Sequence, residues 1–209
     1  MTNSHSRYLA YEHIKHAGIL DIDDIHEKFK RINWKKMYGS TGKVLRSGAW
    51  FTASECKCPY TFGGHAFPAQ PFEPWMVEVS DVLQRLFGIG YRLDSVNLSL
   101  YEDYSQSVGM HEDNEQLFKS SVDGSSFIVS MSFGETRAFG IKGKYDQVKD
   151  AKHIDLNHGD ILSMEDQMQL HYQHSIDPVD SSGRLKGNPR INATWRVLHS
   201  HCKKCPLAS

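Results

Sequence analysis

Apolar and polar side chains alternate along several short segments after residue 90, which is the pattern of half-buried β-strands. The clearest example is the run Val96, Asn97, Leu98, Ser99, Leu100 and Tyr101. Further strands are predicted over residues 126–133, 137–141, 153–156, 160–164, 170–176 and 190–198, with a hairpin turn at Gly134 and Glu135. Many short strands at close spacing, with turn residues between them, predict a double-sheet jelly roll.

Two segments before residue 90 follow a helical pattern instead. The first helix is predicted over residues 22–33, and the second from Pro71 or Pro74 to about Phe87. The apolar stripe of the second helix consists of Met76, Val79, Leu83 and Leu86. We therefore expect a mainly β fold with flanking helices, an α+β arrangement in which helices pack outside a sheet. The chain is interpreted as one domain over residues 1–209, with an N-terminal extension (1–90), a jelly-roll core (91–198) and a cysteine-containing tail (199–209).

The composition is that of an ordinary globular protein. The chain has 209 residues, of which 39% are hydrophobic and 23% charged, so one domain can bury a core large enough to fold unaided. No stretch approaches the roughly 18 apolar residues of a membrane span, and the first residues lack the apolar core of a signal peptide. We expect an intracellular monomer, nuclear or cytoplasmic, without membrane contact.

The formal net charge is −1, so no overall basic field indicates a nucleic-acid partner. A local excess of basic residues lies around Trp34: Lys28, Lys30, Arg31, Lys35, Lys36, Lys43 and Arg46. Such a cluster could contact phosphate groups. A solvated helix end would give the same pattern.

A His-x-Asp pair, His111 and Asp113, carries the first candidate chemistry. Residues two apart on a strand point to the same side, so this pair could reach one metal ion from a single strand. The distant His174 completes two histidines and one carboxylate, a set that holds Fe(II) on one face and leaves other positions open. His171 is the alternative second histidine, although its spacing to the neighbouring residues favours His174.

Polar and charged residues occupy alternate positions of the last predicted strand: Arg190, Asn192, Thr194 and Arg196. Apolar residues fill the positions between them: Ile191, Ala193, Trp195 and Val197. Two guanidinium groups on an inward face require an anionic partner. A dicarboxylate such as 2-oxoglutarate would chelate iron at one end and meet an arginine at the other. A surface strand with solvated arginines is the alternative, which the apolar opposite face disfavours.

Several further motifs follow one another along the chain: Tyr60-Thr61-Phe62-Gly63-Gly64, Tyr101, His111-Glu112-Asp113-Asn114-Glu115, Ser132-Phe133-Gly134-Glu135-Thr136-Arg137, His158-Gly159-Asp160-Ile161-Leu162, His174 and the segment 190–196. With these motifs the chain resembles, from about residue 43 to residue 197, the AlkB family of Fe(II)- and 2-oxoglutarate-dependent dioxygenases, which demethylate alkylated nucleobases. It looks most like the members that repair methyl lesions in double-stranded DNA. The resemblance implies a double-stranded β-helix core with N-terminal helices and a nucleotide-recognition lid.

The resemblance assigns the iron to His111, Asp113 and His174, and the cofactor to Tyr101, Arg190, Asn192 and Arg196. Arg190 would pair with the distal carboxylate of 2-oxoglutarate, and Arg196 would be a second anchor near its iron-chelating end. The family usually has Asn two residues before the tyrosine, where this chain has Ser99. Asn97 lies on the same strand face and is the alternative for that role.

The resemblance places the lid in the early aromatic part of the chain. Trp50, Tyr60 and Phe62 are its candidates for stacking on a flipped base, with core packing as the alternative for each. Glu115 matches a family position that contacts the exocyclic amine of the base. Tyr38 falls near the hairpin tip that duplex-acting relatives insert into the base stack.

The activity implied is oxidative demethylation of 1-methyladenine and 3-methylcytosine in DNA, with RNA as a further candidate substrate. Fe(II), 2-oxoglutarate and dioxygen would be consumed in a reaction that releases formaldehyde, succinate and carbon dioxide. Three alternatives stay open: an RNA-specific base demethylase, a related oxygenase acting on a protein or small molecule, and a non-catalytic nucleic-acid-binding module.

All four cysteines occur in two close pairs: Cys56, Cys58, Cys202 and Cys205. Structural disulfides are not expected in a chain without a secretion signal. Two close pairs far apart in sequence predict a four-cysteine zinc site that joins the tail to the lid region. Free thiols are the alternative, and His199 and His201 are further candidate ligands.

Overall fold

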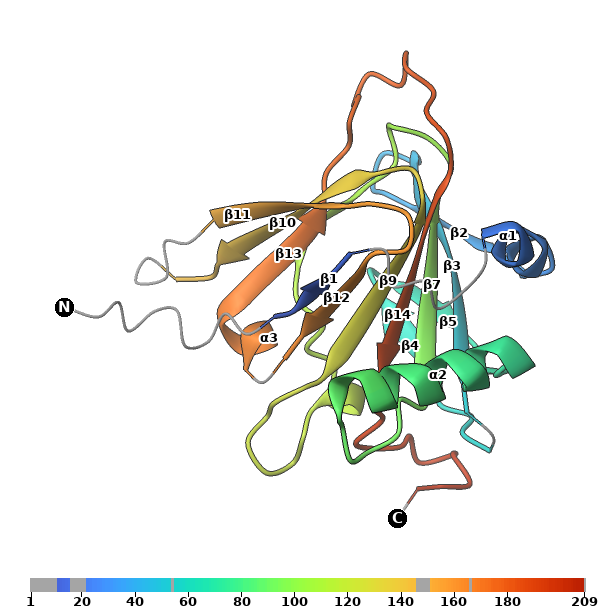
Figure 1. The fold of residues 1–209 in the computed structure, drawn as a ribbon, viewed down its shortest axis with the longest axis vertical. Helices are drawn as coiled ribbons and strands as arrows, with labels where there is room; N and C mark the ends of the chain where they lie inside the picture. Colours follow the sequence, from blue (N-terminus) through green and yellow to red (C-terminus); the bar gives the residue numbers. More distant parts are fainter. Residues whose placement is uncertain (1–10, 16–21, 54, 146–150, 166, 209) are drawn as a thin grey trace.

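The computed structural model describes residues 11–15, 22–53, 55–145, 151–165 and 167–208, and most of its strands belong to two sheets that lie against each other (Figure 1). Within these residues the larger sheet has the order β1 (His13–Ile14), β12 (Ile161–Met164), β9 (Ile128–Gly134), β14 (Arg190–Arg196), β7 (Ser95–Tyr101), β3 (Val44–Thr52) and β2 (Lys35–Tyr38), and β6 (Gln70–Pro71) also pairs with β3. The smaller sheet has the order β11 (Ala151–Leu156), β10 (Arg137–Gly143), β13 (Tyr172–Ile176) and β8 (Val108–His111). A separate hairpin consists of β4 (Tyr60–Phe62) and β5 (His65–Phe67).

Apolar side chains of both sheets pack into the space between them. The larger sheet contributes Tyr101, Ile128, Leu162 and Met164, and the smaller contributes Phe139, Ile141, Tyr172 and Ile176. The mainly β, double-sheet architecture predicted from the alternation is confirmed.

The helices cover the outer face of the larger sheet. α2 (Pro74–Phe87) lies across that face in Figure 1, with Trp75, Met76, Val79 and Leu83 buried. Ile25 and Phe29 of α1 (Ile22–Lys30) join the same core. The outward residues of β7 and β14 complete it: Val96, Leu98, Ala193 and Trp195. The predicted packing of helices outside a sheet is confirmed, although α1 ends at Lys30 rather than at residue 33.

The predicted hairpin at residues 126–141 is wrong, because β9 and β10 belong to different sheets. Gly134 adopts a left-handed φ of 84° at the end of β9. Its backbone N–H donates to the ring of His158, at 3.0 Å, and the N–H of Glu135 donates to the carbonyl of Pro189, at 3.2 Å. Both N–H groups therefore form hydrogen bonds with other segments of the chain. The chain crosses from one sheet to the other at this point instead of folding back on β9.

Two other strand predictions need correction. The predicted strand over residues 170–176 begins with a short helix, α3 (Met168–His171), and only β13 is extended. The N-terminal extension contains strands that the pattern did not indicate, since β3 pairs with β7 over Ser47–Thr52 and widens the larger sheet. The burial pattern explains this omission, because β3 is buried on both faces from Arg46 to its end and shows no alternation.

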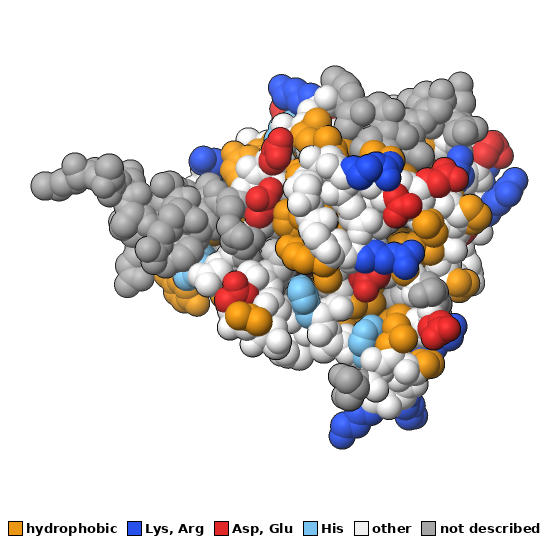
Figure 2. Space-filling model, turned by 60° about the horizontal axis from the view of Figure 1, so that its bottom comes forward, with side chains coloured by type: hydrophobic (Ala, Val, Ile, Leu, Met, Phe, Trp, Pro, Cys, Tyr) orange, Lys and Arg blue, Asp and Glu red, His pale blue; other side chains and the backbone are white. Residues whose placement is uncertain are grey.

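The surface carries no single dominant charge on the face shown in Figure 2, where acidic and basic side chains are interspersed. This mixture agrees with the net charge of −1. In the part of the chain that the structure describes, no helix combines the length and apolar character needed to cross a membrane.

Gly134→Ala should destabilise the protein strongly. A Cβ at this position would meet the carbonyl oxygen of Pro189 at 2.2 Å, in addition to the cost of a left-handed φ. We expect a loss of more than about 2 kcal/mol in the free energy of unfolding. Gly88→Ala is the matched control, because Gly88 has a φ of 62° and no atom within 4 Å of an added Cβ. Its loss should be about 1 kcal/mol, and equal losses in urea unfolding would contradict the close approach at Gly134.

Candidate active site

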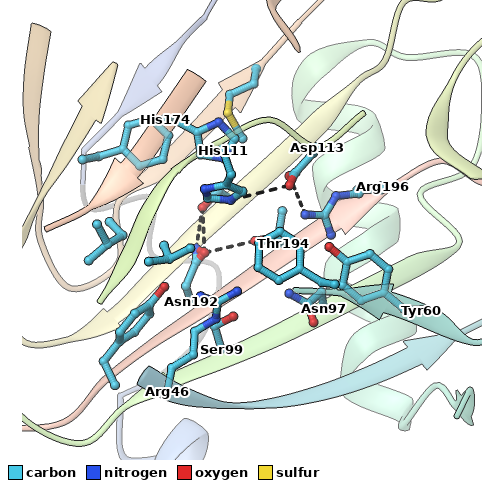
Figure 3. Close-up of a pocket in the computed structure, with 17 residues that line it drawn as sticks. Arg46, Tyr60, Asn97, Ser99, His111, Asp113, His174, Asn192, Thr194 and Arg196 are labelled. Carbon is cyan, nitrogen blue, oxygen red and sulfur yellow. Dashed lines mark hydrogen bonds and ion pairs between the residues drawn. The ribbon is translucent and has the colours of Figure 1, made fainter. Parts of the chain in front are cut away.

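A cavity between the two sheets collects most of the polar residues that the sequence singled out (Figure 3). The larger sheet contributes Asn97, Ser99 and Tyr101 from β7, Ser130 from β9, and Asn192, Thr194 and Arg196 from β14. The smaller sheet contributes His111 and His174, and the β4–β5 hairpin contributes Tyr60 and Phe62. Asn192, Thr194 and Arg196 therefore face the cavity as predicted, whereas Arg190, on the same face of β14, is not among the residues that line it.

Three candidate metal ligands meet at one side of this cavity. His111 and His174 are directly opposite each other in the pairing of β8 with β13. Asp113 joins them, and the ligand atoms of the three residues lie within 4.8 Å of one another. The expectation that His111 and Asp113 share one strand is wrong, since β8 ends at His111 and Asp113 follows in a loop. His171, the alternative histidine, ends α3 and is not part of this group.

Both histidines are prepared to bind a metal ion in their neutral form. The Nδ1 of His111 lies 2.9 Å from the carbonyl oxygen of Gly109, so Nδ1–H donates there and Nε2 keeps its lone pair. Burial lowers the pKa of His174 to about 3, and burial also lowers the pKa of His111. Neutral imidazole is the ligand form, so neither ring has to lose a proton near pH 7.

Asp113 is held as a carboxylate by a buried ion pair. Its Oδ2 accepts a hydrogen bond from Nη2 of Arg196 at 2.5 Å, and both side chains are almost completely buried. Burial alone would raise the pKa of Asp113, but Arg196 and His174 hold it well below its ordinary value. Arg196 also lies 4.9 Å from the ring of Phe118. The predicted second cofactor anchor therefore orients the candidate metal ligand Asp113.

Arg190 is buried without a carboxylate partner among the described residues. It is 1% exposed, and its Nη2 donates to the hydroxyl of Ser132 at 3.0 Å. Its guanidinium lies 5.5 Å from the ring of Tyr101, which lines the cavity. Nε and Nη1 have no hydrogen-bond partner in the described part of the chain, and burial lowers the pKa of Arg190 to about 10. An arginine in this state can bind an anion through the N–H groups of Nε and Nη1.

Polar residues form the wall between Arg190 and the candidate metal ligands. Asn192 accepts a hydrogen bond from Thr194 at 3.0 Å, and its amide nitrogen donates to Ser130 at 2.6 Å. Asn97 and Ser99 both line the cavity, opposite Thr194 and Asn192 in the pairing of β7 with β14. Either one can therefore offer a polar atom to a ligand in the cavity.

The β4–β5 hairpin covers the metal-ligand side of the cavity. Phe62 meets the ring of His111 edge to face, with the ring centres 5.2 Å apart. Tyr60 stacks beside Phe62 at 6.3 Å, as expected for residues that share one strand face. Trp50, predicted as a third stacking residue, is fully buried against Tyr60 and donates its indole N–H to the carbonyl of Cys58. That burial makes Trp50 part of the core under the lid, which corrects the predicted contact with a base.

Glu115 lies next to the lid rather than among the residues that line the cavity. Its carboxylate interacts with the hydroxyl of Tyr60, and its Oε2 is buried without a hydrogen-bond partner among the described residues. Burial, together with the nearby charge of Asp113, raises the pKa of Glu115. A carboxylate in this environment is stabilised by a cation or a hydrogen-bond donor.

The predicted basic cluster does not form one surface patch. Arg46 is 5% exposed, lies 4.9 Å from the ring of Phe62 and lines the cavity. Lys30 pairs with Glu27, and Lys35 donates to the carbonyl of Ala66. Arg46 is thus a site residue that the sequence interpretation assigned to the surface. Its place directly before the buried run of residues 47–52 was the available signal.

Tyr38 is at the end of β2, where a tight turn leads to β3. Its side chain is 50% exposed, which agrees with the predicted hairpin tip. The turn is closed by hydrogen bonds between Gly39 and Lys43 and between Gly42 and Gly39.

The predicted four-cysteine cluster has a different composition. Cys56, Cys58 and Cys205 gather around His201, whereas Cys202 lies outside the group. The predicted ligand Cys202 is therefore replaced by His201, one of the two histidines considered as further candidates.

The chain is similar to known oxygenases in both sequence and fold. The sequence profile of the 2OG-Fe(II) oxygenase superfamily matches residues 20–196. Alpha-ketoglutarate-dependent dioxygenase alkB homolog 3 of Bos taurus is 29% identical over 195 residues, which cover 87% of this chain and 64% of the bovine protein. DNA oxidative demethylase ALKBH2 of Homo sapiens is 24% identical over 217 residues, which cover 93% of this chain and 79% of the human protein. The chain therefore spans less than two thirds of the length of the bovine relative.

Solved structures show the same fold. OsALKBH1 superimposes with a TM-score of 0.58 at 20% identity, covering 91% of this chain and 100% of that chain. An oxidoreductase of the 2OG-Fe(II) oxygenase family from Burkholderia pseudomallei gives a TM-score of 0.57 at 13% identity, covering 95% of this chain and 90% of that chain.

Arg190→Met should raise the stability of the protein and abolish its stabilisation by a bound anion. The substitution removes a buried charge, so the protein without added anion should gain about 1–4 kcal/mol in its free energy of unfolding. Added 2-oxoglutarate should raise the melting temperature of the wild-type protein and leave that of the variant unchanged. Arg184→Met, at an exposed position, is the control that should change neither quantity. Equal stabilisation of wild type and Arg190→Met by 2-oxoglutarate would contradict an anion site at Arg190.

Proposed function

Because the chain belongs to the 2OG-Fe(II) oxygenase superfamily, we propose that it removes methyl groups from alkylated nucleobases, with DNA as the principal substrate. Its curated relatives include AlkB homologues, as the motifs predicted. The observation that supports a base substrate is the contact of Phe62 with His111, together with the partnerless carboxylate oxygen of Glu115, whose side chain interacts with Tyr60 of the same hairpin. A flat, cationic group that enters under the lid would meet aromatic rings next to the metal site, with the negative charge of Glu115 next to Tyr60.

The residues present fit the metal and the cofactor that the superfamily uses. His111, Asp113 and His174 would hold Fe(II), since two neutral imidazoles and one carboxylate are its usual protein ligands. Bound iron, with 2-oxoglutarate and dioxygen, supplies the oxidation of the methyl group, and the products are formaldehyde, succinate, carbon dioxide and the demethylated base. The protein supplies binding, orientation and exclusion of water.

Arg190 and Arg196 have separate tasks in this proposal. Arg190 would receive the distal carboxylate of 2-oxoglutarate through the N–H groups of Nε and Nη1, next to the hydroxyl of Ser132 and the ring of Tyr101. Arg196 keeps Asp113 ionised and fixes the direction of its carboxylate. The polar wall with Asn192 lies between the two arginines and would contact the middle of the cofactor.

The lid residues provide the recognition of the base. A base stacked on an aromatic side chain gains roughly 1–3 kcal/mol, which offsets part of the cost of removing it from a duplex. Phe62 and Tyr60 offer the stacking surface, and Arg46, which also lines the cavity, lies over the ring of Phe62. We expect the target base to lie between this aromatic pair and the metal site.

Glu115 accounts for the choice of lesion. 1-Methyladenine and 3-methylcytosine carry a positive charge and an exocyclic amine next to the methylated nitrogen. A buried carboxylate stabilises that charge and accepts a hydrogen bond from the amine. A neutral base would leave the carboxylate without a counterion, so it would be the poorer substrate.

The exposed Tyr38 supports duplex DNA as a substrate. An aromatic side chain at the tip of a tight hairpin can enter a base stack and take the place of a flipped base. One of the relatives bears the name DNA oxidative demethylase, which supports DNA as the substrate.

Purified protein should release formaldehyde and succinate in equal amounts from oligonucleotides that contain 1-methyladenine or 3-methylcytosine. His111→Ala should reduce both products to background, because the metal site loses one of its three ligands. His153→Ala is the control, since its exposed side chain lies on β11, away from the cavity. Near-normal succinate formation by His111→Ala would contradict the ligand assignment. Turnover that responds to a protein or small molecule, and to no methylated DNA or RNA, would contradict a base substrate.

Glu115→Gln should lower kcat/KM for 1-methyladenine by roughly 10- to 100-fold, the effect of losing a charged hydrogen bond of about 1.5–3 kcal/mol. Turnover of 2-oxoglutarate without nucleic acid should stay the same, because Glu115 is not a metal ligand. Glu78→Gln, on the exposed face of α2, is the matched control. Equal activity of the wild-type protein on N6-methyladenine, a neutral base, would contradict the role of charge.

A further inference from the structure

A second group of metal-ligand side chains lies outside the cavity, where the C-terminal tail meets the segment between β3 and β4. The ligand atoms of Cys56, Cys58, His201 and Cys205 lie within 4.8 Å of one another. Nδ1 of His201 is 3.6 Å from Sγ of Cys56, 3.8 Å from Sγ of Cys58 and 3.6 Å from Sγ of Cys205. The sulfur atoms of Cys205 and Cys56 are 3.8 Å apart.

These separations match the edges of a zinc tetrahedron. Zn–S bonds of about 2.3 Å and Zn–N bonds of about 2.0–2.1 Å place two sulfur ligands about 3.8 Å apart, and a sulfur and a nitrogen ligand about 3.6 Å apart. The observed sulfur–sulfur distance is 3.8 Å, and the three sulfur–nitrogen distances are 3.6–3.8 Å. A disulfide would need about 2.0 Å between its sulfur atoms, and all four cysteines of the chain are free.

Backbone donors point at each of the three sulfur atoms. The N–H of Cys202 donates to Sγ of Cys58 at 3.0 Å. The N–H of Lys57 donates to Sγ of Cys205, and the N–H of Cys58 to Sγ of Cys56, both at 3.5 Å. Hydrogen bonds to sulfur stabilise thiolates, which are the form that binds metal ions.

The group is closed, as a structural site requires. Cys56, Cys58 and Cys205 are at most 5% exposed, and four protein ligands leave no position open for a substrate. Three thiolates with one Zn²⁺ carry a net charge of −1. Lys57 lies between the first two ligands in sequence, and Lys203 and Lys204 lie between His201 and Cys205, so exposed positive charge flanks the site.

The cluster connects the tail to the base of the lid. The carbonyl of Cys58 accepts the indole N–H of Trp50, and the carbonyl of Cys56 accepts the hydroxyl of Thr52, both at 2.9 Å. Tyr60, which lines the cavity, follows Cys58 by two residues. In Figure 1 the tail runs past the segment that leads into β4. A metal ion at this position would fix where the β4–β5 hairpin begins.

We propose that Cys56, Cys58, His201 and Cys205 bind one Zn²⁺, which fastens the C-terminal tail to the start of the β4–β5 hairpin. Zinc fits because tetrahedral sites rich in thiolate bind Zn²⁺ or iron–sulfur clusters, and a site of three sulfurs and one histidine nitrogen with single-ion spacing selects zinc. The site is independent of the iron site, with which it shares no ligand.

Zinc content should be measured by mass spectrometry in the full chain carrying His111→Ala and His174→Ala, so that zinc cannot occupy the iron site. We expect about one zinc per chain after dialysis against a mild chelator. A further substitution in this variant, either Cys205→Ser or His201→Ala, should abolish the zinc content. Cys202→Ser should retain it, because Cys202 is not one of the four residues whose ligand atoms lie within 4.8 Å of one another. Its backbone N–H donates to Sγ of Cys58, and its thiol lies next to the Cys58 thiol.

A conservative variant tests the zinc site even if the variants that lose zinc fail to fold. His201→Cys keeps four soft ligands and should retain about one zinc per chain. Hydrogen exchange of residues 55–60 and 199–208 should become faster when a thiol reagent releases the zinc. Absence of zinc from protein made with zinc available would overturn the proposal. Loss of zinc in Cys202→Ser equal to that in Cys205→Ser would also overturn it, as would iron with acid-labile sulfide at this position.

Discussion

Burial of charge between two sheets is the constraint on which the arrangement of the site depends. Arg190 and Arg196 stand on one face of β14, at 1% and 3% exposure. Arg196 is neutralised by Asp113, whereas the described part of the chain gives Arg190 only a hydroxyl and an aromatic ring. A buried charge without a counterion costs several kcal/mol. The fold therefore supplies a counterion to Arg196 and, among the described residues, none to Arg190.

The outer face of the same sheet supplies the stability that makes this arrangement possible. Trp195 and Ala193, on the back of β14, pack with the buried stripe of α2 and with the outward residues of β7. Each large apolar side chain buried there contributes roughly 1.5–3 kcal/mol. The polar inner face and the apolar outer face belong to the same strands, so the site cannot shift without disturbing the core behind it. This coupling keeps Arg190 and Arg196, which both lie on β14, at a fixed separation.

The two-residue period made the central strands and the inward face of the site predictable, because residues 95–101 and 190–196 each have one apolar and one polar face. Sequence spacing could not show which strands become partners, and Gly134 illustrates this, since hydrogen bonds to distant segments carry the chain to the other sheet. The sequence around an aromatic residue next to a lid looks the same whether its side chain faces the core or the cavity. For this reason the predicted contact of Trp50 with a base was wrong. The sequence offered His201 only as a further candidate ligand, because the choice between His201 and Cys202 depends on the tertiary packing of the tail.

The position of β14 in the larger sheet affects when the cavity forms during folding. This strand is the last in the chain, yet it lies in the middle of the larger sheet, between β9 and β7. Its pairings join residues about 60 to 100 positions apart, such as Arg190 with Gly134 and Arg196 with Ser95. Contacts of such long range form slowly during folding. Until β14 inserts, β9 and β7 have no common neighbour, and Asn192, Thr194 and Arg196 are missing from the wall of the cavity. A chain without β14 in place would keep the three candidate metal ligands, which lie on other segments, but would lack the ion-pair partner of Asp113.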